Sequence, residues 1–415
     1  MGGESQTHMK NNNVVIGHHY WNRPSGGPLV CASTAYALEQ LGFSPILTST
    51  TDFDQRNYEK WFRIDLTRYT KQSWKLGLSR FDLYLKLLDW RPMLSAIRRW
   101  NAGLLFTDEV MYKPLLKHKA KMGFKIIEYV HFPYEVSMEP KFQGSGFSYG
   151  GESYMVERYG RFPMNMYLWG YRKLLPHYMR KNPFEAADLV LTNSSWTCNL
   201  AKLVYNDTPV ILNPPLPPNV EVTASAGKYE KKDRTIIMLG RFTAEKRFHW
   251  VITDVMPRLV KEVPDVKLLI LGAAITGPAH SYIERLKKLI EESGVKDAVL
   301  LLPDVTRDVI DITMDKSMVF LNATINETWG IVVAEAMARG LPVVIHKSGG
   351  AWTDIVREGS YGFGYESAEE ATEIISRLLT DQVLWHRFSS ASKERASDFT
   401  ISSFTMKLNK LLDGL

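Results

Sequence analysis

Two carboxylates with seven residues between them are the strongest candidates for chemistry in this sequence. They are Glu327 and Glu335 in the segment NETWGIVVAE. An apolar run at 317–324 predicts a strand before them, and the pattern from Gly330 to Arg339 predicts a helix. Eight helical steps of about 1.5 Å place them about 12 Å apart, too far for paired acid–base hydrolysis. The spacing suits two ends of one elongated ligand, although a helix-capping and a fortuitously buried glutamate are the structural alternative.

A glycine turn with two cations stands earlier in the same half of the chain. Gly240 and Arg241 follow a strand predicted at 235–239, and Lys246 precedes a helix predicted at 248–262. Amides at a helix start favour an anion, and a guanidinium binds phosphate oxygens in pairs. The turn therefore predicts a diphosphate site, with a solvated basic loop as the alternative.

Three further features have weaker signals. Gly26 and Gly27, in a loop expected at 21–28, would let a phosphate or acceptor approach the backbone, although a simple turn explains them equally. His131 ends a strand predicted at 124–132, where a structural histidine is the common case. Asp52 and Asp54 form a DxD pattern that we expect to be a polar loop. No cluster has metal-ligand spacing, so we predict no metal.

The composition is that of a soluble globular protein. The chain has 415 residues, 45% hydrophobic and 23% charged, which excludes a coiled coil, a collagen or a mainly disordered chain. Two cysteines provide no disulfide framework, and no apolar run approaches the length of a membrane span. The polar N-terminus predicts no signal peptide. We therefore expect a protein of the reducing cytoplasm.

Strand and helix patterns alternate in two halves, which predicts an α/β fold with two parallel sheets facing each other across a cleft. NPPLPPNV (213–220) is the predicted hinge, because it holds four prolines in eight residues. We expect a flexible tail, an N-terminal acceptor domain, a C-terminal donor domain, and a terminal helix that packs back on the first domain, at residues 1–12, 13–218, 219–398 and 399–415 respectively. The predicted strands are 14–20, 45–50, 103–108, 124–132 and 187–194, then 235–242, 266–274, 298–303, 317–324 and 342–350; the predicted helices are 29–42, 81–90, 112–122, 248–262, 280–293 and 329–339.

Charge and aromatic residues are concentrated in the first half. The first 220 residues hold 26 Lys and Arg against 18 Asp and Glu, and 33 of the 48 aromatic residues, whereas the remainder has a net charge of −2. Basic aromatic segments at 58–100 and 141–184 predict contact with a membrane surface; a core helix with a solvated charged face is the alternative. Nucleic acid is not expected, because no recognition motif accompanies the charge.

GRFTAEKR followed by NETWGIVVAE resembles the retaining nucleotide-sugar glycosyltransferases of family 4, from about residue 14 to the C-terminus. That family has the GT-B fold of two Rossmann-like domains. YVHFP, ADLVLTNSSWT and HKSGGAWTDIV are most similar to the subfamily of dolichol-linked-oligosaccharide α-1,2-mannosyltransferases. The resemblance implies GDP-mannose as the donor, a polyprenyl-phosphate-linked glycan as the acceptor, and a peripheral location on the cytoplasmic face of a membrane.

The resemblance also implies roles for twelve residues. Arg241 and Lys246 would neutralise the leaving diphosphate, Glu327 would orient the donor sugar, and His131 would reach the sugar from the first domain. Front-face substitution without metal or cofactor is implied. The donor-binding residues would be Gly26, Gly27, Gly240, Val305, Gly330, Ile331, Val332 and Glu335, with Glu335 on the ribose and Val305 beside the base.

Two alternatives remain open: a UDP-sugar-dependent transferase with another acceptor, and a nucleotide-sugar-binding protein without turnover. An NAD oxidoreductase is a distant third, because SGGPLV lacks the G-x-G-x-x-G pattern.

Overall fold

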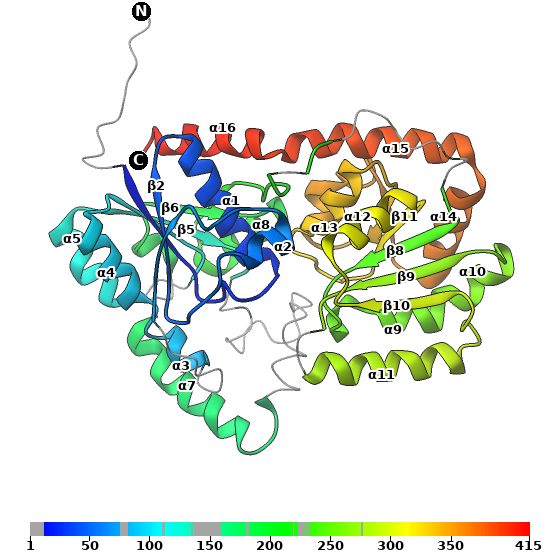
Figure 1. Cartoon of the computed structure of the whole chain (residues 1–415), viewed down its shortest axis with the longest axis horizontal. Helices are drawn as coiled ribbons and strands as arrows, with labels where there is room; N and C mark the ends of the chain where they lie inside the picture. The colour runs from blue at the N-terminus through cyan, green and yellow to red at the C-terminus, as the bar shows by residue number, and fades with distance from the viewer. Residues whose placement is uncertain are drawn as a thin grey trace, which may run out of the picture.

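A computed structural model of the chain describes residues 12–74, 82–109, 113–133, 136, 159–179, 182–218, 220–222, 229, 232–274 and 277–415. Two parallel sheets form the frame of the molecule, and each has helices on both faces (Figure 1). The strand order is β3-β2-β1-β4-β5-β6-β7 in the first sheet and β10-β9-β8-β11-β12-β13 in the second. The α/β expectation is confirmed.

The first sheet is buried on both faces, as a parallel sheet requires. Val14 and Ile16 of β1 pack under α1 and the C-terminal helix α16, whereas Val15 packs against α4. The elements of this half are β1 (Asn13–Gly17), α1 (Gly26–Gln40), β2 (Ser44–Ser49), α2 (Asn57–Phe62), β3 (Thr70–Ser73), α3 (Asp82–Lys86), α4 (Trp90–Trp100), β4 (Leu104–Thr107), α5 (Lys113–Met122), β5 (Lys125–Val130), α7 (Met164–Tyr178), η4 (Pro183–Glu185), β6 (Leu189–Thr192), α8 (Ser195–Tyr205) and β7 (Val210–Ile211).

The second sheet follows the same rule, with Ile236 and Met238 of β8 on one face and Ile237 on the other. Its elements are β8 (Thr235–Leu239), η6 (Ala244–Lys246), α9 (Phe248–Trp250), η7 (Val251–Val255), α10 (Met256–Glu262), β9 (Lys267–Gly272), α11 (Gly277–Glu292), β10 (Val299–Pro303), α12 (Arg307–Lys316), β11 (Val319–Asn322), α13 (Ile331–Ala338), β12 (Val343–His346), η8 (Ala351–Ile355), β13 (Phe363–Tyr365), α14 (Ala368–Thr380), α15 (Gln382–Ala396) and η9 (Ser397–Phe399). The last helix, α16 (Ile401–Leu412), returns to the first core.

Several helices differ from the sequence prediction or lie in segments that had no predicted helix, among them α2, α8, α14 and α15. Helix α1 begins at Gly26 rather than at residue 29, so Gly26 and Gly27 form its first turn and not a loop. The helix predicted at 81–90 is two helices, α3 and α4, and α4 runs on to Trp100. Helix α12 lies in a segment that had no prediction. Part of the segment 141–184 lies outside the described residues.

Contacts on two sides join the domains. The carboxylate of Asp354 in η8 accepts hydrogen bonds from the N–H and Oγ of Ser195 at the start of α8, at 2.9 and 2.6 Å. On the opposite side of the cleft, Arg63 pairs with Asp308 and Asp311 of α12. Helices α15 and α16 run in line across both domains (Figure 1), and α16 joins the core under α1. In the described part of the chain, every helix is too short or too polar to span a bilayer.

Candidate active site

Two connected cavities of about 710 and 490 Å³ lie between the carboxyl ends of the two sheets. Residues from both domains line each of them, and Gly240, Arg241, Val332 and Glu335 line both. All twelve residues that the sequence singles out are in the lining of one cavity or the other. Val305 lies in the larger cavity, together with Trp61 and Phe62 of the first domain, and His131 lies in the smaller.

Lys246 and Glu327 form the ion pair at the base of the smaller cavity, with Nζ 2.7 Å from Oε2. Burial alone would raise the pKa of Glu327, but the Lys246 ammonium outweighs it and holds that pKa below its usual range. The carboxylate is therefore ionised at neutral pH and can accept hydrogen bonds from sugar hydroxyls. Arg241 is half exposed and pairs loosely with Glu245 at 3.3 Å, which leaves its guanidinium accessible to an anion.

Glu335 is buried because it is paired. Its Oε2 lies 2.8 Å from Nη2 of Arg307, whose Nε donates to Asp311 at 2.9 Å. Burial alone would lower the pKa of Arg307, but Glu335 and Asp311 outweigh it and raise that pKa. A glutamate in an apolar helix face is unusual unless it is paired, and Arg307, which the sequence did not single out, is its partner.

The starts of α13 and α1 face each other across the cleft. Gly330 precedes α13 with φ of +89°, a backbone conformation that favours glycine. Gly26, in the first turn of α1, approaches Ile331 so closely that a Cβ there would lie 3.8 Å from Cδ1 of Ile331. Two helix N-termini therefore border one cavity, and their free amides favour a negatively charged ligand.

On the first-domain side, the structure adds residues that the sequence analysis missed. Gly17 and Thr107 are partners in the pairing of β1 with β4, so His18 and Asp108 follow side by side at the sheet edge. Asp108 contacts His18 at 2.7 Å and His131 at 3.0 Å. The sequence signal that could have found them is a polar residue directly after an apolar strand, as in VVIGHH and LLFTDE.

A second buried charge pair lies beside this group. Lys86 of α3 binds the carboxylate of Glu109 at 2.7 Å, and its ammonium lies 5.5 Å from the ring centroid of Tyr20. Burial alone would raise the pKa of Glu109, but Lys86 outweighs it and lowers that pKa. All three residues line the smaller cavity. They form part of its wall on the first-domain side.

One group of side chains resembles a metal site in composition. Among the described residues, His18, Cys31 and Asp108 bring their ligand atoms within 4.8 Å of one another. The 2.7 Å separation of His18 Nδ1 from Asp108 Oδ1 is a hydrogen-bond length. Two ligands on a tetrahedral zinc ion stand about 3.3 Å apart. The spacing therefore fits a hydrogen-bonded network, and metal independence stays a prediction.

Two parallel-sheet α/β domains with a cleft between them are the GT-B fold of glycosyltransferases. Residues 222–395 match the family model described as "Glycosyl transferases group 1". Solved structures with the same fold include a glycosyltransferase from Rickettsia africae, at a TM-score of 0.65, 16% identity and 97% coverage of both chains. Anabaena HepE in complex with UDP-glucose has a TM-score of 0.66 and 16% identity, with 97% of this chain and 100% of that chain covered. The GT-B fold is thereby confirmed, and the second half carries a group 1 glycosyltransferase domain.

Two mammalian sequence relatives have the same name. The human "GDP-Man:Man(3)GlcNAc(2)-PP-Dol alpha-1,2-mannosyltransferase" is 29% identical over 208 residues, which are 47% of this chain and 42% of that protein. The mouse protein of the same name is 25% identical over 354 residues, 79% of this chain and 68% of that protein. The chain thus spans less than half of the human relative and about two thirds of the mouse one.

Proposed function

We propose that this protein is a retaining family 4 glycosyltransferase that moves mannose from GDP-mannose to a glycan carried on a polyprenyl diphosphate. The observation that carries the proposal is the meeting of Lys246–Glu327 and Arg307–Glu335 with two helix N-termini in one cleft. Cations and amides would bind the diphosphate, Glu327 the sugar and Glu335 the ribose. The names of the relatives support mannose, GDP and the lipid-linked acceptor.

In this mechanism the charge that develops on the leaving diphosphate is stabilised by Arg241, Lys246 and the amides after Gly330. The acceptor hydroxyl attacks from the face that the phosphate leaves, and a phosphate oxygen takes its proton. The sugar therefore keeps its anomeric configuration without a covalent enzyme intermediate. Glu327→Gln should lower kcat without trapping a glycosyl-enzyme, and a sugar adduct on any carboxylate would exclude this mechanism.

The direct test is transfer of radiolabelled mannose from GDP-mannose to a lipid-linked oligosaccharide. We expect an extended lipid-linked product, and no product from UDP-glucose. A thermal-shift panel of GDP-, UDP- and ADP-sugars should show stabilisation only by the guanine nucleotides, because a bound ligand stabilises the folded state according to its affinity. Stabilisation by UDP-sugars alone would favour the alternative donor. Binding without turnover with any acceptor would favour a non-catalytic binding protein.

We further propose that the first domain rests on an anionic membrane through α7 and α4. Met166 and Trp169 of α7 are 62% and 63% exposed and stand three residues apart, so they lie on one face of the helix. Phe162, just before the helix, is 77% exposed. The opposite face of α7 packs through Tyr171 and Leu175. Exposed apolar residues with a tryptophan on an amphipathic helix are typical of an interfacial contact.

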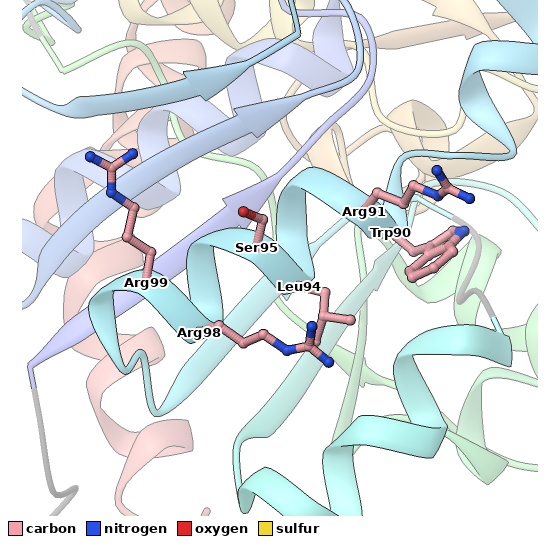
Figure 2. A pocket seen from close by; sticks show the side chains of 6 residues that line it. All are labelled: Trp90, Arg91, Leu94, Ser95, Arg98 and Arg99. Carbon is pink, nitrogen blue, oxygen red and sulfur yellow. The ribbon is translucent and has the colours of Figure 1, made fainter.

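Helix α4 supplies the positive charge. Arg91, Arg98 and Arg99 project from it around a surface hollow of about 470 Å³ (Figure 2). None of the three has a carboxylate within ion-pair distance among the described residues; Arg98 contacts His118 of α5 at 3.2 Å. Each cation near an anionic surface contributes about 1 kcal/mol.

Flotation with vesicles tests this contact. We expect binding to phosphatidylserine-containing vesicles at low salt and weaker binding to phosphatidylcholine alone. Trp169→Ser and the triple change of the three arginines to serine should each reduce binding, whereas Leu203→Ser, which alters an exposed leucine of α8, should not. Absence of binding to both vesicle types would refute the proposal.

A further inference from the structure

Asp108 joins two histidines that come from different strands. Its Oδ1 lies 2.7 Å from Nδ1 of His18, and its Oδ2 lies 3.0 Å from Nε2 of His131. The carboxylate is 3% exposed, so water cannot replace either partner. Both oxygens of one buried group are therefore committed to imidazole rings that follow β1 and β5.

The charge state of Asp108 decides which nitrogens carry protons. Burial alone would raise its pKa, but His18 and His131 outweigh burial and hold that pKa far below its usual range. An ionised carboxylate only accepts hydrogen bonds. Nδ1 of His18 and Nε2 of His131 must therefore both be N–H donors. In the neutral ring of His131, a proton on Nε2 leaves Nδ1 as an acceptor.

The first turn of α1 closes over this arrangement. A Cβ on Gly27 would lie 3.2 Å from Oδ2 of Asp108 and 3.6 Å from Nε2 of His131. The carboxylate has no room to swing toward α1. His131 is 30% exposed and lines the smaller cavity with Glu327 and Lys246. Among the described residues, nothing hydrogen-bonds to its Nδ1.

We propose that Asp108 is a positioning residue for sugar transfer. It fixes the ring of His131 and the proton on Nε2, so that Nδ1 is available to accept a hydrogen bond from a sugar hydroxyl in the cleft. The inference rests on the proposed transferase function and adds a residue that touches neither sugar nor nucleotide.

Asp108→Asn tests the assignment, because an amide has one acceptor oxygen and an NH₂ group and cannot accept from both rings. We expect kcat to fall on the order of 10²-fold, with the Kd for GDP changed less than about threefold. In a His131→Ala background the same substitution should lower kcat by less than about threefold, since the effects of substitutions at coupled residues are not additive. Equal losses in both backgrounds would overturn the proposal.

A matched control is Asp89→Asn, which alters another fully buried carboxylate of this domain that accepts from the Thr50 amide at 3.0 Å. Its kcat should stay within about twofold of wild type.

Long-range ¹H–¹⁵N spectra of ¹⁵N-histidine-labelled protein give a readout that needs no activity. The His131 signal should report an Nε2 proton in wild type and in Asp89→Asn, and a changed pattern in Asp108→Asn. A wild-type ring protonated only on Nδ1 would refute the bridge even if transfer is observed. A wild type that transfers no sugar but shows the Nε2 proton would refute the proposed function and leave the bridge standing.

Discussion

At the scale of single residues, the site combines carboxylates that need partners with cations that supply them. Glu335 is the clearest case, because it is buried in an apolar helix face and its charge is matched by Arg307 at 2.8 Å. Removing one member of such a pair leaves an uncompensated buried charge, which costs more than removing both. The pair can therefore be tested by stability and by ligand binding separately.

Arg307→Ala should lower the free energy of unfolding by about 3 kcal/mol, because it leaves Glu335 unpaired. Replacing both residues with methionine should recover most of that stability, since no buried charge remains, and Asp311 keeps its contact with Arg339. The double variant should nevertheless bind GDP more weakly than wild type, because the carboxylate proposed for the ribose is gone. Chemical denaturation and calorimetric titration measure the two effects. Full recovery of GDP affinity in the double variant would contradict the role of Glu335.

Asp89 makes the stability of the protein depend on pH. Burial raises its pKa to about 7, above the unfolded value of about 3.9. The folded state then holds the proton more tightly, so the stability this group gives at low pH is lost as pH rises from about 4 to about 7. The free energy of unfolding of Asp89→Asn, relative to that of wild type, should increase by about 2–3 kcal/mol as pH rises from about 5 to about 8. A constant difference in denaturation free energy over that range would contradict the shifted pKa.

At the scale of elements, the turn before α13 places the donor-side groups. Gly330 adopts φ of +89°, and a Cβ there would lie 3.1 Å from Val333 and 3.2 Å from Glu327. The left-handed turn lets the chain pass from Glu327 directly into the helix that carries Glu335. A side chain at this position would strain the backbone and press on Glu327, the carboxylate proposed to bind the sugar.

Gly330→Ala should cost about 1–3 kcal/mol of stability and weaken donor binding. Gly277→Ala is the control, because Gly277 starts α11 with open space around it and a compatible substitution there leaves stability unchanged or raises it by up to about 1 kcal/mol. Thermal unfolding with and without GDP compares them. Equal behaviour of the two variants would show that the turn has no special conformation.

The elements also show how far the sequence could predict this molecule. Buried strands and the motifs after them were visible locally, because a parallel sheet needs apolar runs and its ligands gather where the strands end. The link between His18, Asp108 and His131 was not visible, since it depends on the register of β1 with β4 and on β5 far along the chain. Helix α1 starts early because Gly26 and Gly27 tolerate helical backbone in a first turn, where the expectation had been a loop.

At the scale of the whole molecule, the final helix belongs to the first domain. Phe404, Leu408 and Leu412 of α16 are buried in the core that contains Val14 and Ile16 of β1. The chain therefore crosses between domains twice, once through the proline-rich segment and once after α15. The two crossings, with the Ser195–Asp354 contact, set how the two walls of the cleft face each other.

Leu408→Ala should lower the free energy of unfolding of the first domain by about 2–5 kcal/mol, because it opens a cavity in that core. Met406→Ala on the same helix, at a side chain that is 62% exposed, should change it by less than about 0.5 kcal/mol. Differential scanning calorimetry with and without GDP should separate the domains, since the proposed nucleotide site lies in the second. A loss of stability in Leu408→Ala that is confined to the second domain would contradict the packing of α16 in the first core.

The same helix sets the order in which the protein can mature during synthesis. The second domain has all its strands and helices once residue 399 has left the ribosome. The first domain, although it is translated earlier, lacks part of its core until α16 follows. It must wait, with the apolar face of α1 uncovered, for the whole second domain to be made. The first-domain wall of the cleft is therefore completed only after the second-domain wall.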